Sequence, residues 1–150
     1  MRPCFHRWHR VLGLPQQAPS WYRARLSEEL RERRLASTPL TKLSETADVL
    51  FCVSRSCYDG FPVRTVPLPS PATFAGRLLS TYILTKYTSR FLFYRTAAGL
   101  SDITQYRSVR EVVNPSNEKK LEEVAFRHQL DPVSFKRVAR LLRRVWPLLP

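Results

Sequence analysis

Glycine is scarce in this sequence, with only four residues in 150, and no two of them lie close together. The glycine-rich loops that cradle phosphates are therefore absent, and so are the GxSxG, HExxH and paired CxxC motifs. Enzymes that use nucleotides, a serine nucleophile or zinc commonly carry one of these signatures. We therefore expect a protein that is not an enzyme, with no catalytic residue, no cofactor and no metal site.

Long apolar runs are also missing. The most apolar stretch, residues 74–98, is interrupted by Arg77, Lys86, Arg90 and Arg95. Because a membrane-spanning helix needs about 20 predominantly apolar residues, we expect no transmembrane segment. The N-terminal residues lack the apolar core of a secretory signal, and three cysteines are an odd number, which favours reduced thiols. We expect an intracellular protein, nuclear or cytoplasmic unless its N-terminus directs it elsewhere.

Acidic residues are few as well, 12 against 25 basic residues, which gives a formal net charge of +13. Twenty of the basic residues are arginine and five are lysine. The planar guanidinium donates paired hydrogen bonds to phosphate and carboxylate groups, so this bias favours recognition of anions. The expected partners are nucleic acid, RNA rather than DNA, or an acidic protein surface; the sequence identifies no small-molecule ligand.

Residues 1–19 are basic and acid-free, and a segment rich in proline and glutamine closes them. Mitochondrial targeting segments share this composition, although they are usually richer in serine. A flexible basic arm would share it too, and both interpretations stay open. We expect the folded domain to begin near Ser20 and to extend to residue 150.

Proline and capping residues divide the rest of the chain into helices. Four prolines between residues 61 and 72 forbid a helix there and predict an extended crossing. Elsewhere, capping residues precede apolar residues at helical spacing. The expected helices cover residues 21–35, 39–58, 71–99, 102–113, 116–128 and 132–146. The predicted fold is all-α, a compact bundle of five or six helices with a flexible basic N-terminal arm.

The last predicted helix carries the strongest functional signal. At about 100° per residue, its cations fall within an arc of about 120°. These candidate binding residues are Lys136, Arg137, Arg140, Arg143 and Arg144. The opposite side is apolar, and it consists of Phe135, Val138, Leu141, Leu142 and Val145. We expect the apolar side to be buried and the arginine ridge to bind RNA or an acidic protein surface.

A helix-turn-helix that reads DNA is an alternative for residues 116–128 and 132–146. Apolar residues stand at the expected offsets, and Ala125 is the small residue inside the first helix. Gln129 stands where glycine is usual, and His128 departs from the apolar pattern. Asp131 at the start of the second helix opposes docking on a phosphate-lined groove.

An enzyme is the second alternative. His128 follows Glu122 and Glu123 and precedes Asp131, and these side chains could act together as an acid and a base. A solvated helix end has the same composition, so the pattern does not identify a reaction.

Several runs resemble a family of short, basic proteins found in filamentous fungi. They are SWYRARLSEELRERR, KLSETADVLFCVSRSCYDGFPVR, YILTKYTSRFLFYRTAAG, REVVNPSNEKKLEEVA and RVARLLRRVWPLLP. The resemblance covers about residues 20–150, and it implies that residues 1–19 are the variable part. It implies no site and no mechanism.

Overall fold

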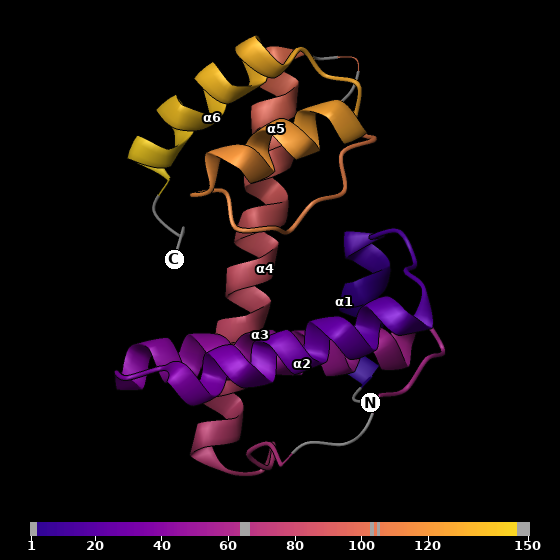
Figure 1. Cartoon of the computed structure of the whole chain (residues 1–150), viewed down its shortest axis with the longest axis vertical. Helices are drawn as coiled ribbons and strands as arrows, with labels where there is room; N and C mark the ends of the chain where they lie inside the picture. Colours follow the sequence, from indigo (N-terminus) through magenta and orange to yellow (C-terminus); the bar gives the residue numbers. More distant parts are fainter. Residues whose placement is uncertain (1–2, 64–66, 103, 105, 147–150) are drawn as a thin grey trace. The chain divides into compact units, whose positions relative to one another are not determined.

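The computed structural model describes residues 3–63, 67–102, 104 and 106–146, and every regular element within these ranges is a helix. The helices are α1 (Pro3–Leu12), α2 (Pro19–Leu35), α3 (Pro39–Tyr58), α4 (Phe74–Ser101), α5 (Glu118–Arg127) and α6 (Pro132–Val145) (Figure 1). The predicted all-α class with five or six helices is confirmed. None of these helices pairs enough length with enough apolar character to cross a lipid bilayer.

Two helices begin where their capping residues predicted. Thr38 accepts a hydrogen bond from the Thr41 amide at 3.1 Å, and the Thr41 hydroxyl accepts one from the Thr38 amide, so α3 starts with a capping box. Asp131 accepts a hydrogen bond from the Ser134 amide at 2.7 Å and starts α6. In both cases proline follows the cap, where its missing N–H costs no hydrogen bond.

The boundaries of α4 differ from the prediction. The helix starts at Phe74 because the Ser70 carbonyl accepts hydrogen bonds from Thr73, which forms a separate turn before it. Gly76 lies so close to the Ser70 backbone that a Cβ atom there would clash. Gly99 does not end the helix, which continues to Ser101. A Cβ atom on Gly99 would lie 3.3 Å from the Cβ atom of Tyr106. Glycine at this position therefore leaves room for the Tyr106 side chain to pack against α4.

The short helix predicted over residues 102–113 does not form in the described part of that range, which excludes residues 103 and 105. Asp102 instead accepts hydrogen bonds from the amide and hydroxyl of Thr104, and these bonds hold its pKa below the usual range. Val109 and Val112 are nevertheless buried. These valines are apolar because an irregular segment packs them into the core, and not because they line one face of a helix. Residues 61–63 and 67–70 form no helix, as predicted for the proline-rich crossing, whereas residues 71–72 belong to the turn before α4; residues 64–66 lie outside the described ranges.

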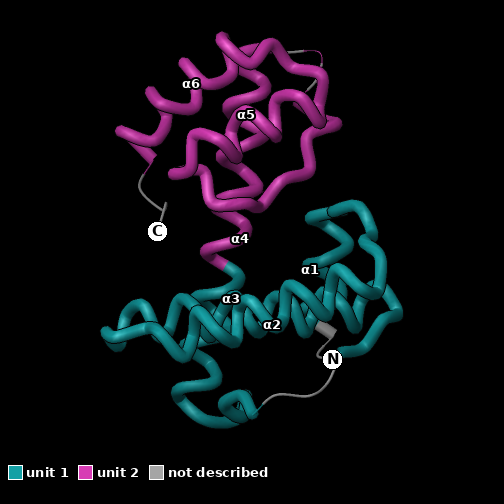
Figure 2. Tube along the Cα trace, viewed as in Figure 1, with its two compact units in different colours: residues 1–84 teal, residues 85–150 magenta. Residues whose placement is uncertain are grey.

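The chain divides into two compact units, residues 1–84 and residues 85–150, with the boundary inside α4 (Figure 2). The predicted single domain over residues 20–150 stays a prediction. In the first unit α2 and α3 lie side by side, and the buried Leu26, Val49 and Cys52 pack together. In the second unit α5 and α6 pack on the C-terminal half of α4 around a larger apolar core.

Residues 3–12 are the helix α1 and not an arm. Phe5, His9 and Leu12 are buried, and His9 Nε2 lies 2.9 Å from Ser54 Oγ on α3. Burial lowers the pKa of His9 to about 3, with the nearby Arg55 and His6 adding to the effect, so the ring is neutral at pH 7. Residues 1 and 2 lie outside the described ranges, and a targeting role for residues 1–19 stays a prediction.

Candidate functional site

The C-terminal hairpin of α5 and α6 carries the predicted binding residues. Asn117 caps α5 by accepting hydrogen bonds from the amides of Lys119 and Lys120 at 3.0 and 3.3 Å. The tight turn to α6 depends on Gln129, whose φ of 56° is left-handed. The Leu130 amide then donates to the Ala125 carbonyl at 2.9 Å, which closes the end of α5.

The inward side of α6 is narrower than its sequence pattern suggested. Phe135 and Ala139 are fully buried, and Val138 and Leu142 are partly buried against the same core. Leu141 and Val145 were also predicted on the buried side, but 57% and 74% of their surface is exposed. This part of the prediction is wrong, because α6 covers the core with only one edge of its apolar side.

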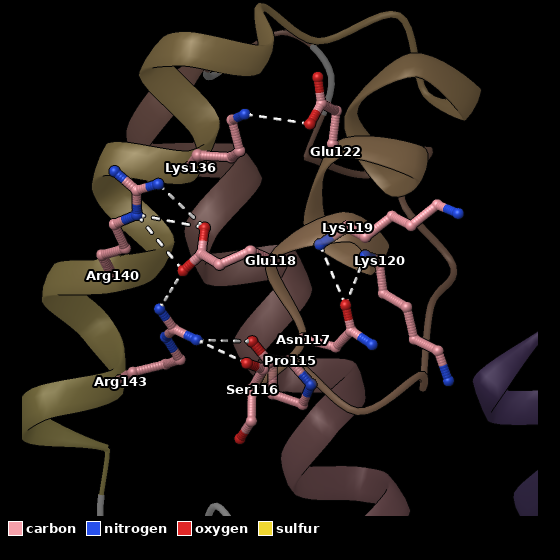
Figure 3. A network of polar contacts seen from close by, with 10 residues as sticks. All are labelled: Pro115, Ser116, Asn117, Glu118, Lys119, Lys120, Glu122, Lys136, Arg140 and Arg143. Carbon is pink, nitrogen blue, oxygen red and sulfur yellow. Dashed lines mark hydrogen bonds and ion pairs between the residues drawn. The ribbon is translucent and has the colours of Figure 1, made fainter.

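Three of the five predicted binding cations contact acids on α5 (Figure 3). Lys136 Nζ lies 3.2 Å from Glu122 Oε2. Arg140 and Arg143 both pair with Glu118; the Arg140 contact is 3.0 Å. Their hydrogen bonds, those of Arg140 first, hold the pKa of Glu118 below its usual range. These cations join the two helices, and the two acids compensate two of their three charges.

Arg143 also fastens the start of α5. Its guanidinium donates to the carbonyls of Pro115 and Ser116 at 3.3 and 3.1 Å (Figure 3). One side chain on α6 thus bonds both the first acid of α5 and the turn before it. Its geometry indicates a structural role, whether or not it also contacts a partner.

The other two cations, Arg137 and Arg144, are exposed and form no ion pair or hydrogen bond with any residue that the structure describes. At 100° per residue they share an arc of about 120° with three exposed apolar side chains. We call this arc the outer stripe; it consists of Val133, Arg137, Leu141, Arg144 and Val145. Apolar contact area and uncompensated positive charge therefore occur together on one face of α6.

Glu118 and Glu122 were not predicted as partners of the arginine ridge on α6. They are four residues apart on α5, so they share one helical face. That spacing, with a basic ridge on the next helix across a short turn, was a usable signal for ion pairs between the helices. This signal could have distinguished the cations that pair with α5, namely Lys136, Arg140 and Arg143, from Arg137 and Arg144.

The acidic residue that contacts His128 is not one of those predicted for the alternative site. His128 Nε2 lies 3.3 Å from Glu111 Oε1, and Arg127 pairs with the same oxygen. Glu122 contacts Lys136 and Asp131 caps α6, so those two acids serve other contacts. A cleft of about 840 Å³ lies in the first unit between α2, residues 60–63 and Pro67, and His128 does not line it.

Comparison of the chain with protein-family models, curated proteins and solved structures gave no match. The resemblance to short, basic fungal proteins therefore stays a prediction.

Proposed function

We propose that this chain is a non-enzymatic binding protein whose outer stripe docks on an acidic protein surface that also offers apolar contacts. The observation that carries the proposal is the position of Arg137 and Arg144. Both are exposed and without a described partner, and both lie among exposed apolar side chains.

A protein partner fits this composition better than RNA does. Val133, Leu141 and Val145 expose 66%, 57% and 74% of their surface, and burying them releases about 25 cal/mol for each Å² removed from water. Phosphate contacts would make little use of that apolar area. The cations beside the outer stripe on α6, Arg140 and Lys136, already form ion pairs with acids on α5. What remains is a mixed apolar and arginine surface, and arginine is enriched at protein interfaces.

The packing of α6 against its own unit supports the same proposal. Its inner edge is buried through Phe135 and Ala139, and the pairs with Glu118 and Glu122 join it to α5. A preformed helix loses little conformational entropy when it binds, so more of the contact energy contributes to affinity. Helices that dock in this way present anchors spaced three and four residues apart, as the outer stripe does.

The first test is the double substitution Arg137→Gln with Arg144→Gln in the full-length tagged chain. The chain is purified from its cells of origin, where we expect the wild type to recover a stoichiometric, nuclease-resistant protein partner. In the variant the affinity for this partner should fall about tenfold or more, so less of the partner should be recovered. Helix content should not change, because neither side chain has a described partner. Quantitative affinity purification and circular dichroism measure the two effects.

The matched control is Lys119→Gln with Lys120→Gln, which removes the same charge from α5 in the same unit. Partner recovery should stay near wild type in this variant. Equal losses in both variants, together with nuclease-sensitive recovery, would instead indicate binding to RNA through diffuse charge. Unchanged recovery in the Arg137 and Arg144 variant would refute the proposal.

A helix-turn-helix that reads DNA is the second candidate, and the turn gives it a specific argument. Gln129 adopts the left-handed conformation that glycine usually supplies in that motif, and Val124, Leu130 and Phe135 are all buried. This candidate predicts affinities that differ by about a hundredfold or more among duplex sequences at fixed salt. Fluorescence anisotropy with a panel of duplexes measures this, and uniform affinity would count against specific recognition.

A further inference from the structure

Three carboxylates of the first unit meet between α2 and α3. Glu29 and Glu32 are three residues apart on α2, and Glu45 comes from α3, which lies beside it (Figure 1). One oxygen atom from each side chain lies within 4.8 Å of the other two. Such proximity is costly for ionised groups unless a positive charge or a proton compensates them.

The innermost of these side chains has an oxygen atom available to bind a ligand. Glu29 is only 2% exposed, and its Oε1 forms an ion pair with Arg25. Its Oε2 is buried and receives no hydrogen bond from the residues that the structure describes. A buried carboxylate oxygen without a donor loses its hydration and gains nothing in exchange, which is rare in folded proteins. Glu29 therefore contributes to the cluster a buried carboxylate with one oxygen atom that no described donor satisfies.

We propose that Glu29, Glu32 and Glu45 bind one hard divalent cation of the Mg²⁺, Mn²⁺ or Ca²⁺ class. These ions prefer carboxylate oxygens and bind them at about 2.0–2.6 Å, so two oxygens on one ion lie at most about 5 Å apart. The observed limit of 4.8 Å fits that range. The absence of sulfur and imidazole in the cluster disfavours zinc or copper.

The three side chains are graded from buried to exposed, which gives an ion access. Glu32 is exposed, Glu45 is partly buried and Glu29 is buried. An ion could therefore exchange with solvent past Glu32 while Glu29 provides its innermost ligand. Three protein ligands leave positions for water, as is common for Mg²⁺ and Mn²⁺.

A proton is the competitor for this site. Burial raises the pKa of Glu29 to about 7, and Asp48, Glu32 and Glu45 raise it further, while Arg25 lowers it. Cys52 on α3 also faces this carboxylate, and burial first, then the Glu29 charge, raises the pKa of its thiol to about 12, so the thiol stays neutral. Because carboxylates bind cations only in their ionised form, cation binding should weaken at acidic pH.

The test uses full-length protein stripped with a chelator and titrated with Mn²⁺ at pH 8, with free Mn²⁺ followed by electron paramagnetic resonance. We expect one saturable site whose affinity falls about tenfold or more in Glu29→Gln and in Glu32→Gln. Lowering the pH to 5.5 should weaken wild-type binding, because protons compete with the cation for carboxylate oxygens. Competition with Mg²⁺ and Ca²⁺ identifies the preferred ion.

The control is Glu28→Gln, which removes a neighbouring carboxylate that also pairs with Arg25 but does not belong to the cluster. It should bind Mn²⁺ like the wild type. If Glu29→Gln does not fold, the exposed Glu32→Gln decides the question alone. Absence of saturable uptake in the wild type, or equal affinity in wild type and Glu32→Gln, would refute the proposed site.

Discussion

Phe135→Ala is expected to lower the free energy of unfolding of the C-terminal unit by about 3–5 kcal/mol. Phe135 is fully buried in the core of that unit, and its ring stacks on Tyr94 with centroids 6.4 Å apart. Removing the ring leaves a cavity among Leu121, Val124 and Ala139, which belong to the same core. Few point substitutions should cost this chain more, because α6 is held to its unit mainly through this edge.

The matched control is Leu141→Ala on the same helix. Both residues belong to the apolar side that the sequence predicts, but 57% of Leu141 is exposed. Its loss should therefore change stability by less than about 0.5 kcal/mol. Urea unfolding followed by circular dichroism measures both values. Similar costs for the two substitutions would mean that α6 is packed differently from the structure described above.

Local signals predicted helices well where a cap and a proline act together. Thr38 with Pro39 and Asp131 with Pro132 start α3 and α6 as expected, because both effects depend only on neighbouring atoms. Asn117 rather than Ser116 caps α5, an error of one residue among adjacent capping residues.

The failures involve residues whose conformation depends on distant contacts. α1 forms in a segment that composition alone describes as an arm, and Trp8 packs edge-on against Phe51 of α3 with centroids 5.9 Å apart. The predicted short helix after Ser101 is replaced by an irregular chain that buries Val109. Tertiary packing overrides local preference in both places, and a single sequence does not contain those contacts explicitly.

The position of the candidate site was predictable, but which of its cations pair with acids on α5 was not. Periodicity located the cations of α6 correctly on one side of the helix. It could not tell that Arg140 and Arg143 face Glu118, since that depends on how α5 and α6 are packed. The distinction decides the experiment, because replacing Arg143 would also disturb the start of α5.

Glu29→Gln is expected to change how stability depends on pH. The folded-state pKa of Glu29 is about 7 and its ordinary value is 4.5, so the folded protein keeps this proton in a range where the unfolded chain has lost it. The free energy of unfolding of the wild type should therefore be highest, as far as this group is concerned, below about pH 4.5. It should fall as the pH rises through 7, by on the order of 3 kcal/mol in total.

Glutamine has nearly the same shape and does not ionise, so the variant should lack this loss. With a chelator present to remove divalent cations, the variant and the wild type should have similar stability near pH 4.5. At pH 8 the variant should be more stable by on the order of 3 kcal/mol, because the wild type then buries a charge that Arg25 compensates only in part. Glu28→Gln, whose carboxylate is 54% exposed, should follow the wild-type profile. Parallel profiles of stability against pH for wild type and Glu29→Gln would mean that Glu29 ionises at neutral pH without loss of stability. That result would contradict the burial of this carboxylate and the lack of a hydrogen bond to its Oε2.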